Sequence, residues 1–449
     1  MDKIKLFFKN YGRYIFVFVL VFLIYEFFGY GITYGDPLAN YGFSYAIKNG
    51  QIPYLEFNTI STPLYAFIMS LGLHIFDNYL MFIIEQSILV TIMFYFLYQM
   101  YEEKSYWVLF GFIFFGFYGI LPTYNFCCFM MLVILLYLEK KHGDKDYLIG
   151  IFIGLCILSK HTVGTFFVLP TIIMYFKDWK RILRRACGAL IPGFVFIVYL
   201  LVNGAFFDFI NLCFGGLIDF SSNNGNAFTI WFYLSIILFI IMLIILIKDR
   251  KNIINWYLIF TYVFVVPLFD ICHFALYFGC FLLMLLSYVP KSKYDNYLVK
   301  LNIMLLITIC LLNVRMGLMY KPVFMKKINR FNFTLNSSYS YKQNLKVDKF
   351  LKKYDDPLIL SYHKMFYDIY NGNELDYYDV IMYGNFGYDG VHSMIKDISK
   401  MNDRYIIVDI TSYEKKGADE QFAKEIVEYV MESCEKIDSK HNFDVYYKK

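Results

Sequence analysis

Residues 34–65, YGDPLANYGFSYAIKNGQIPYLEFNTISTPLY, separate two long apolar spans near 14–32 and 79–100. The segment is polar and aromatic, and it is rich in proline, glycine and asparagine. Such a backbone cannot satisfy its own hydrogen bonds inside a bilayer, so it is predicted to lie at the membrane surface. It contains two carboxylates, Asp36 and Glu56, and we expect it to form the floor of a catalytic site.

The composition is that of an integral membrane protein. Hydrophobic residues make up 59% of the 449 residues and charged residues 18%, and the mean hydropathy is +0.48. These values lie outside the usage of soluble domains. The apolar residues recur in blocks of roughly 17 to 22, which predicts a polytopic α-helical protein and not a barrel of alternating strands.

Charge and cysteine usage exclude other classes. The formal net charge is only +5, and the basic residues are spread over connectors in the manner of topology signals, so we expect no nucleic-acid partner. The nine cysteines lie mostly inside apolar spans and form no CxxC pair, so no zinc site is predicted.

The apolar spans predict about eleven transmembrane helices. After the first, they lie near 79–100, 106–121, 124–138, 147–159, 162–176, 186–203, 228–247, 253–267, 273–289 and 299–318. If the spans alternate, nearly all connector Lys and Arg residues fall on the side of the basic N-terminus. By the positive-inside rule this side is the cytoplasm, and the protein is a multi-pass protein of the cell membrane. The first outer loop is then 32–78, and Asp36 faces outward.

Two domains are predicted, a transmembrane catalytic domain over 1–320 and an extracytoplasmic domain over 321–449. In the second, the runs PLILSY, YYDVIMYG and RYIIVDI are typical of strands, and 391–401 and 419–434 have helical periodicity. This alternation predicts a small α/β domain with a mainly parallel sheet. Residues 203–228 are too polar to span and are predicted to lie at the interface near the first loop.

Acidic residues give the first site candidates. Asp36, followed by Pro37, is placed to act as a general base at the membrane surface, or it only begins a turn. Glu56 could orient a substrate, bind a metal or be merely solvated. Glu26 and Glu85 lie within predicted membrane helices and are second-rank candidates, because intramembrane carboxylates are costly.

Basic residues on the same predicted side give the complementary candidates. Lys160 and His161 interrupt two apolar spans and could bind a phosphate, although a lysine there could also reach the interface and serve as an anchor. His273 opens a late span, with Asp270 three residues before it, and is otherwise a packing histidine. Arg315 could meet an anionic headgroup or anchor the last span.

These residues resemble the bacterial relatives of protein O-mannosyltransferases and of the aminoarabinose transferase of lipid A, within the C-type (GT-C) glycosyltransferases. The similar motifs are Gly35-Asp36, Gly50-Gln51-Ile52-Pro53-Tyr54-Leu55-Glu56-Phe57, Thr62-Pro63-Leu64-Tyr65, Lys160-His161-Thr162 and His273-Phe274. The sequence departs from that pattern at Pro37, where relatives often have Glu, and at Ser61-Thr62, where they have a cation and a proline. The resemblance therefore leaves Lys160, His161, His273 and Arg315 as the implied ligands of the lipid phosphate.

The resemblance implies a GT-C-like fold with two interfacial helices in the first outer loop. It implies a hexosyl- or pentosyltransferase for cell-envelope glycan biosynthesis, with a polyprenyl-phosphate-linked sugar as donor and a glycan, lipid or protein as acceptor. Asp36 would be the catalytic base in an inverting transfer, assisted by Glu56. Membrane lipids are the expected surroundings, and a divalent metal (Mg²⁺ or Mn²⁺) at Asp36 and Glu56 is left open. The alternatives are a lipid-linked-sugar flippase or transporter and a non-catalytic membrane scaffold.

Overall fold

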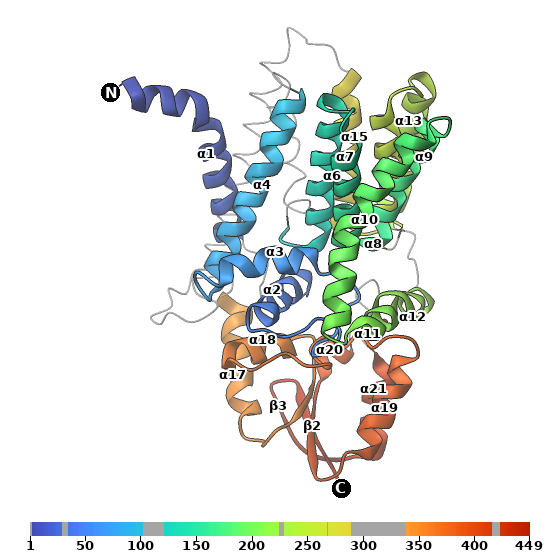
Figure 1. Cartoon of the computed structure of the whole chain (residues 1–449). Helices are drawn as coiled ribbons and strands as arrows, with labels where there is room; N and C mark the ends of the chain where they lie inside the picture. Colours follow the sequence, from blue (N-terminus) through green and yellow to red (C-terminus); the bar gives the residue numbers. More distant parts are fainter. Residues whose placement is uncertain are drawn as a thin grey trace.

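The structure, a computed structural model, describes residues 2–28, 35–101, 121–223, 229–266, 268–288, 338–414 and 423–449. Long helices run side by side in one half of the molecule, and a mixed sheet with its own helices forms the other half (Figure 1). The N-terminus and the C-terminal half lie at opposite ends of the helical half. We call the end that carries the C-terminal half the domain end.

The helices of the first half coincide with nine of the predicted spans. Their bounds are α1 (Asp2–Phe28), α4 (Tyr79–Tyr101), α6 (Tyr124–Lys141), α7 (Asp146–Ser159), α8 (His161–Gly164) with η2 (Thr165–Val168) and α9 (Leu169–Tyr175), α10 (Trp179–Val202), α13 (Ile230–Lys248), α14 (Ile253–Phe260) with η4 (Thr261–Phe264), and α15 (Ile271–Tyr288). Among the described residues, four helices are long and apolar enough to cross a membrane, namely α4, α10, α13 and α15. The predicted spans at 106–121 and 299–318 lie outside the described residues, so the count of eleven stays a prediction.

Small residues set the closest helix contact. A Cβ atom on Gly150 or Gly154 of α7 would collide with the backbone of α10, and one on Gly188 of α10 would collide with the backbone of α7. Without a hydrophobic driving force between helices in lipid, such close approach is what holds helix pairs together. The α7–α10 pair is therefore a fixed element of the bundle.

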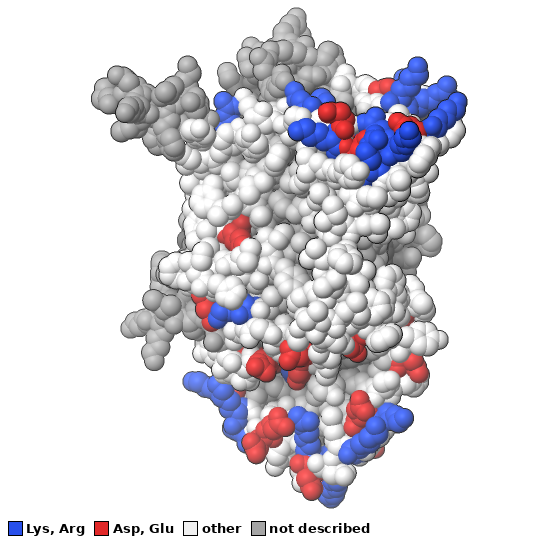
Figure 2. Space-filling view, in the orientation of Figure 1, with Lys and Arg blue, Asp and Glu red and all other residues white. Residues whose placement is uncertain are grey.

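The charges divide the surface into three zones. On the face that Figure 2 shows, the bundle carries an almost uncharged band, with a crowd of Lys and Arg at one end and mixed charges over the C-terminal half at the other. We call the Lys- and Arg-rich end the basic end. An uncharged belt between charged ends is what a membrane-embedded bundle requires.

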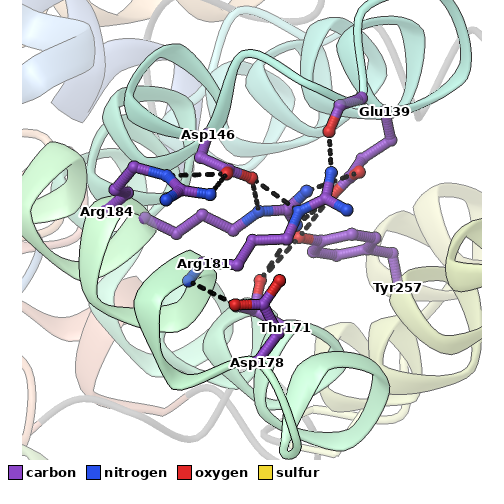
Figure 3. A network of polar contacts seen from close by, with 9 residues as sticks. Glu139, Asp146, Thr171, Asp178, Arg181, Arg184 and Tyr257 are labelled. Carbon is purple, nitrogen blue, oxygen red and sulfur yellow. Dashed lines mark hydrogen bonds and ion pairs between the residues drawn. The ribbon is translucent and has the colours of Figure 1, made fainter.

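Some of the basic residues do more than mark topology. Arg185 is buried, with 1% of its side chain exposed, and its guanidinium contacts Glu139 at 2.5 Å and Asp146 at 3.0 Å. Arg181 and Arg184 also bind Asp146, each at 2.8 Å. This network, shown in Figure 3, joins the end of α6 to the starts of α7 and α10. From the sequence alone these arginines are only topology signals, because the sequence does not show which carboxylates face them.

Two short segments lie across the domain end, as predicted. The first loop contributes α2 (Gly35–Lys48) and α3 (Leu64–Leu73), which lie between the long helices and the C-terminal half (Figure 1). The second segment comprises α11 (Phe206–Ile210), the π-helical turn η3 (Asn211–Gly215) and α12 (Gly216–Asn223). Tyr54 of the first loop packs edge-on against Phe209, with ring centroids 5.2 Å apart. The two segments are therefore neighbours.

The C-terminal half contains a four-stranded sheet in the order β1-β2-β4-β3. Its elements are α17 (Ser338–Leu351), β1 (Leu358–Leu360), α18 (Lys364–Asn371), α19 (Gly390–Lys400), β2 (Arg404–Asp409), α20 (Ile410–Tyr413), α21 (Lys424–Ser433), β3 (Glu435–Lys440) and β4 (Phe443–Lys448). Only β1 and β2 pair in parallel, Leu358 opposite Ile406, whereas β4 is antiparallel to both of its neighbours.

The predicted mainly parallel sheet is therefore wrong, and the reasons are local. His441 and Asn442 both have positive φ, 57° and 64°, and join β3 to β4 by the two-residue turn that favours antiparallel hairpins. The predicted strand at 377–384 forms turns instead. The carboxylate of Asp379 accepts a hydrogen bond from the backbone of Asp376 at 2.5 Å and pairs with Lys364, so local side-chain bonds replace a sheet ladder.

The C-terminal half is docked onto both segments of the domain end. The amide of Gln51 makes two hydrogen bonds with the backbone of Leu375, at 2.8 and 3.0 Å. The backbone of Gly384 donates to Asp219 of α12 at 2.7 Å. Gly384 also approaches Gly216 so closely that a Cβ on either residue would collide with the carbonyl oxygen of the other. These contacts fix the C-terminal half against the first loop and against α12.

Candidate functional site

Hydrogen bonds tie three parts of the chain together at the domain end. The side chain of Asn40 donates to the carbonyl of Asp36 at 2.7 Å and accepts from the backbone of Tyr124 at 3.1 Å, which ties α2 to the start of α6. Next along α6, Asn125 accepts a hydrogen bond from the ammonium of Lys160 at 2.6 Å. The start of α2, the start of α6 and the α7–α8 junction are thus directly connected.

Lys160 is a buried cation whose ammonium makes no direct contact with a described carboxylate. It is 6% exposed, and its Nζ lies 5.6 Å from the ring centre of Tyr124 and 5.8 Å from that of Phe264. In the described part of the chain it forms no ion pair, and its hydrogen-bond acceptor is the neutral amide of Asn125. An ammonium has three donors, so a buried site of this kind is incomplete without an anion.

His273 and Asp270 form a compact pair just beside this lysine. One carboxylate oxygen of Asp270 accepts from the backbone N–H of His273 at 2.8 Å, and the other lies 2.9 Å from its ring Nδ1. Both side chains stand at the start of α15, after the turn that follows η4. The charge and hydrogen bonds of His273 outweigh the effect of burial and hold the pKa of Asp270 below its usual range.

Asp36 completes the group. It retains exposed surface, yet protein atoms surround its carboxylate closely enough that burial raises its pKa. The charges of His273 and Lys160 oppose that rise, and the charge of Asp270 adds to it. We call Asp36, Lys160, Asp270 and His273 the domain-end cluster. Its members are close enough for each to influence the ionisation of Asp36.

Burial also acts on the lysine of the cluster. It lowers the pKa of Lys160 to about 8, against the opposing charges of Asp36 and Asp270. A pKa of about 8 leaves Lys160 mainly charged at neutral pH. Because its cationic form is costly to bury, a bound anion would be strongly favoured here.

A small cavity lies beside the cluster, on the side of the first loop. Asn40 and Tyr124, which border the cluster, line it together with Thr59, Ser61 and Thr62. The hydroxyl of Ser61 lies 3.1 Å from that of Thr59. The first loop also contributes apolar lining, including Phe43, Ile47 and Phe57, so its wall is uncharged and largely apolar with a few hydroxyl and amide groups.

The structure places the remaining predicted site residues elsewhere. Glu56 is exposed and accepts a hydrogen bond from the backbone of Ile52 at 2.5 Å, and its charge acts on Tyr199 and Tyr377, toward the C-terminal half. The ring Nε2 of His161 lies 3.2 Å from the carbonyl of Cys213 in η3. His161 thus faces the second interfacial segment.

Other candidates lie apart from the cluster or outside the described residues. Glu85 accepts a hydrogen bond from the backbone of Gly72 in α3 at 3.1 Å, which gives it a local structural role. Arg315 and the side chain of Glu26 lie outside the described residues. Of the predicted site residues, the structure brings together Asp36, Lys160 and His273.

Asp270 and Asn125 belong to the site but are not among the predicted site residues. The spacing of Asp270 and His273, three residues apart at the start of an apolar span, was a usable signal for the first. No sequence signal marks Asn125, because its role depends on the contact between α6 and the α7–α8 junction.

The described residues do not fit a resident divalent metal. Among them, no group of three or more His, Cys, Asp or Glu is arranged to hold a metal ion. Both carboxylate oxygens of Asp270 are already engaged by His273, and the interactions of Glu56 involve no member of the cluster. We therefore derive no chemical step through a metal.

No protein-family model and no curated protein sequence matches the chain. A solved structure does. The fold is similar to the crystal structure of ArnT from Cupriavidus metallidurans in the apo state, with a TM-score of 0.50 and 12% sequence identity. The similarity covers 97% of this chain and 98% of that chain. The chain therefore has an ArnT-like membrane fold over nearly its whole length.

Proposed function

We propose that the protein is a membrane glycosyltransferase of the GT-C type that moves a sugar from a polyprenyl-phosphate donor to a hydroxyl group of an extracytoplasmic glycan, lipid or protein. The observation that carries the proposal is the convergence of Asp36, Lys160 and His273 at the domain end of an ArnT-like fold. A base and cations around one opening are the groups that such a transfer needs. The position of the basic end, opposite the C-terminal half, supports a cytoplasmic N-terminus.

Asp36 would act as the general base. Its carboxylate takes the proton of the acceptor hydroxyl while that oxygen bonds to the anomeric carbon, and the bond from this carbon to the phosphate oxygen breaks on the opposite face. The product is inverted at the anomeric carbon. A carboxylate whose pKa is raised by burial is a stronger base than a solvated aspartate, which suits this step.

Lys160 and His273 would stabilise the departing polyprenyl phosphate. The donor is a phosphodiester with one negative charge, and the leaving phosphate acquires a second as the bond breaks. Fixed cations in a site shielded from water stabilise such growing charge more than water does. The ammonium of Lys160, whose hydrogen-bond acceptor among the described residues is a neutral amide, supports this role. Glu56 is assigned a supporting role near the acceptor side of the first loop.

The test is sugar transfer by the full-length protein in nanodiscs, from a polyprenyl phosphate that carries a radiolabelled hexose or pentose, to envelope extracts. Asp36→Asn is expected to lower the transfer rate on the order of 10²- to 10⁴-fold, as the loss of a general base does. Glu56→Gln is expected to lower it far less. Asp144→Asn, an exposed carboxylate at the basic end, is the matched control.

Two outcomes would overturn parts of this proposal. Full transfer by correctly folded Asp36→Asn would remove the base assignment. If the wild-type protein binds polyprenyl phosphate but transfers no sugar from any donor, a lipid carrier or flippase becomes the better interpretation.

A further inference from the structure

We propose that Asp270 is a positioning residue that holds the His273 ring as a cation whose Nε2–H is directed at the leaving phosphate. This inference rests on the proposed transferase function. It adds Asp270, which does not itself touch the reacting atoms, and it requires that His273, which does, be positively charged.

The contact between the two residues fixes the ring. A carboxylate is an acceptor only, so the Nδ1 atom, 2.9 Å from Asp270, must carry a hydrogen. The second oxygen of Asp270 holds the backbone N–H of the same residue at 2.8 Å, which anchors the carboxylate itself. Because Nδ1 carries its hydrogen toward Asp270, Nε2 can donate a hydrogen bond to a phosphate only when both ring nitrogens are protonated.

Nothing in the described part of the chain occupies the other ring nitrogen. His273 is 6% exposed, and among the described residues its hydrogen bonds are those to Asp270. Nε2 has no hydrogen-bond partner among the described residues, yet it is not one of the fully buried atoms without a partner. It is therefore accessible at the edge of the ring. The charge of His273 acts on the ionisation of Asp36 more strongly than the charge of Lys160 does.

A helix cap alone does not explain this arrangement. Asp270 precedes α15, and its bond to the backbone of His273 is an ordinary capping contact. A cap needs no second bond to the ring and no neighbouring base. Among the described residues, the titratable or charged groups that interact with His273, or with the two carboxylates beside it, are Asp36 of α2, Tyr124 of α6, Lys160 of the α7–α8 junction, and Asp270 and Cys272 next to the ring.

The charges balance when the ring is cationic. Asp36 and Asp270 contribute two negative charges, and Lys160 and His273 contribute two positive ones. During transfer, Asp36 becomes neutral as it takes the acceptor proton, while the leaving phosphate gains one negative charge. The net charge of the site is then unchanged, and no proton has to leave His273.

The test uses Asp270→Asn and Asp270→Ser in the full chain. Both residues cap helices about as well as Asp, so a residue that only caps predicts nearly unchanged transfer in both. If Asp270 acts through the ring, both variants lose transfer on the order of 10- to 100-fold, as the loss of a carboxylate behind a functional histidine does. The pH dependence of transfer in Asp270→Asn should also differ from that of the wild type, because Nδ1–H no longer donates to a carboxylate. Thermal unfolding of each variant checks the fold.

A double-mutant cycle shows whether Asp270 acts through His273. In a His273→Gln background, Asp270→Asn is expected to have almost no further effect, within about 2-fold. Equal effects in both backgrounds would overturn the inference, and so would an unshifted pH profile in Asp270→Asn.

Binding of polyprenyl phosphate without a sugar separates this inference from the proposed function. Its affinity in nanodiscs is measured against pH for the wild type and Asp270→Asn. A shifted pH dependence of binding without any sugar transfer by the wild type would remove the transferase function and keep the pairing. Sugar transfer by the wild type, with the same pH dependence of binding in Asp270→Asn, would keep the transferase function and remove the role of Asp270.

Discussion

The helices α6 and α7 carry buried charge at both ends, and the two ends differ in how completely that charge is paired. At the basic end, Arg185 meets Glu139 and Asp146 at 2.5 and 3.0 Å, and the hydroxyl of Tyr257 donates a further bond to Glu139 at 3.0 Å. Figure 3 shows how these groups converge. At the domain end, Lys160 has one neutral amide acceptor, Asn125.

The difference teaches how to separate a structural ion network from a binding site in a membrane protein. A buried charge whose partners are all supplied by the chain contributes to the fixed packing of helices. A buried charge with no counter-ion remains costly until something else supplies one. The first description fits the basic end, and the second fits Lys160.

The largest expected effect comes from breaking the paired end. Arg185→Met leaves Glu139 buried without its cation, and we expect the free energy of unfolding to fall by about 3–5 kcal/mol. Unfolding of the purified protein in detergent measures it. Arg184→Met is the control, because 42% of the Arg184 side chain is exposed, and its loss should cost no more than about 1 kcal/mol. An equal fall in the free energy of unfolding in the two variants would mean that the burial of Arg185 does not add to its contribution.

The corresponding change at the unpaired end should separate binding from stability. Lys160→Met removes a charge that has no direct ion pair among the described residues, so we expect a smaller loss of stability than in Arg185→Met. Binding of a polyprenyl phosphate should weaken by about 1.5–3 kcal/mol, or roughly 10- to 150-fold, as for a charged hydrogen bond. Titration in nanodiscs measures it, with Lys180→Met as control. A marked loss of stability would place Lys160 with the structural residues.

The smallest expected effect is a shift in the pH dependence of transfer. Asp36 must be ionised to act as a base, and burial raises its pKa, so the acid limb should lie above the ordinary aspartate value of about 3.9. The charge of Lys160 opposes that rise. In Lys160→Met, the limb should therefore move to still higher pH. The pH–rate profile of the residual activity measures this shift. An unmoved limb would mean that the titrating base is not Asp36.

The sequence could predict which residues lie on the same side of the membrane as Asp36, but not which of them contact it. The apolar periodicity places nine spans, and the two interfacial segments follow from their Pro, Gly and Asn content. Lys160 and His273 could be placed on the side of Asp36 from the alternation of basic connectors, because parity is a property of the whole chain. The sequence could not separate them from Glu56 and His161, which lie on the same side but face other elements.

The C-terminal half was predicted less well for a related reason. The strands β1 and β2 were found by their apolar runs, whereas β3, with the sequence EKIDSK, is exposed along its whole length and carries no apolar pattern. Its pairing with β4 depends on a two-residue turn and not on burial. Edge strands of this kind are held by their neighbours, and their own sequence marks them poorly.

The contact between Gly216 and Gly384 bears on the ancestry of the fold. The two residues belong to different halves of the chain, and their backbones touch where any side chain would force the halves apart. Substitution at one position therefore cannot be repaired by substitution at the other. Chains that inherit this docked arrangement should retain both glycines, however far the rest of their sequence has diverged.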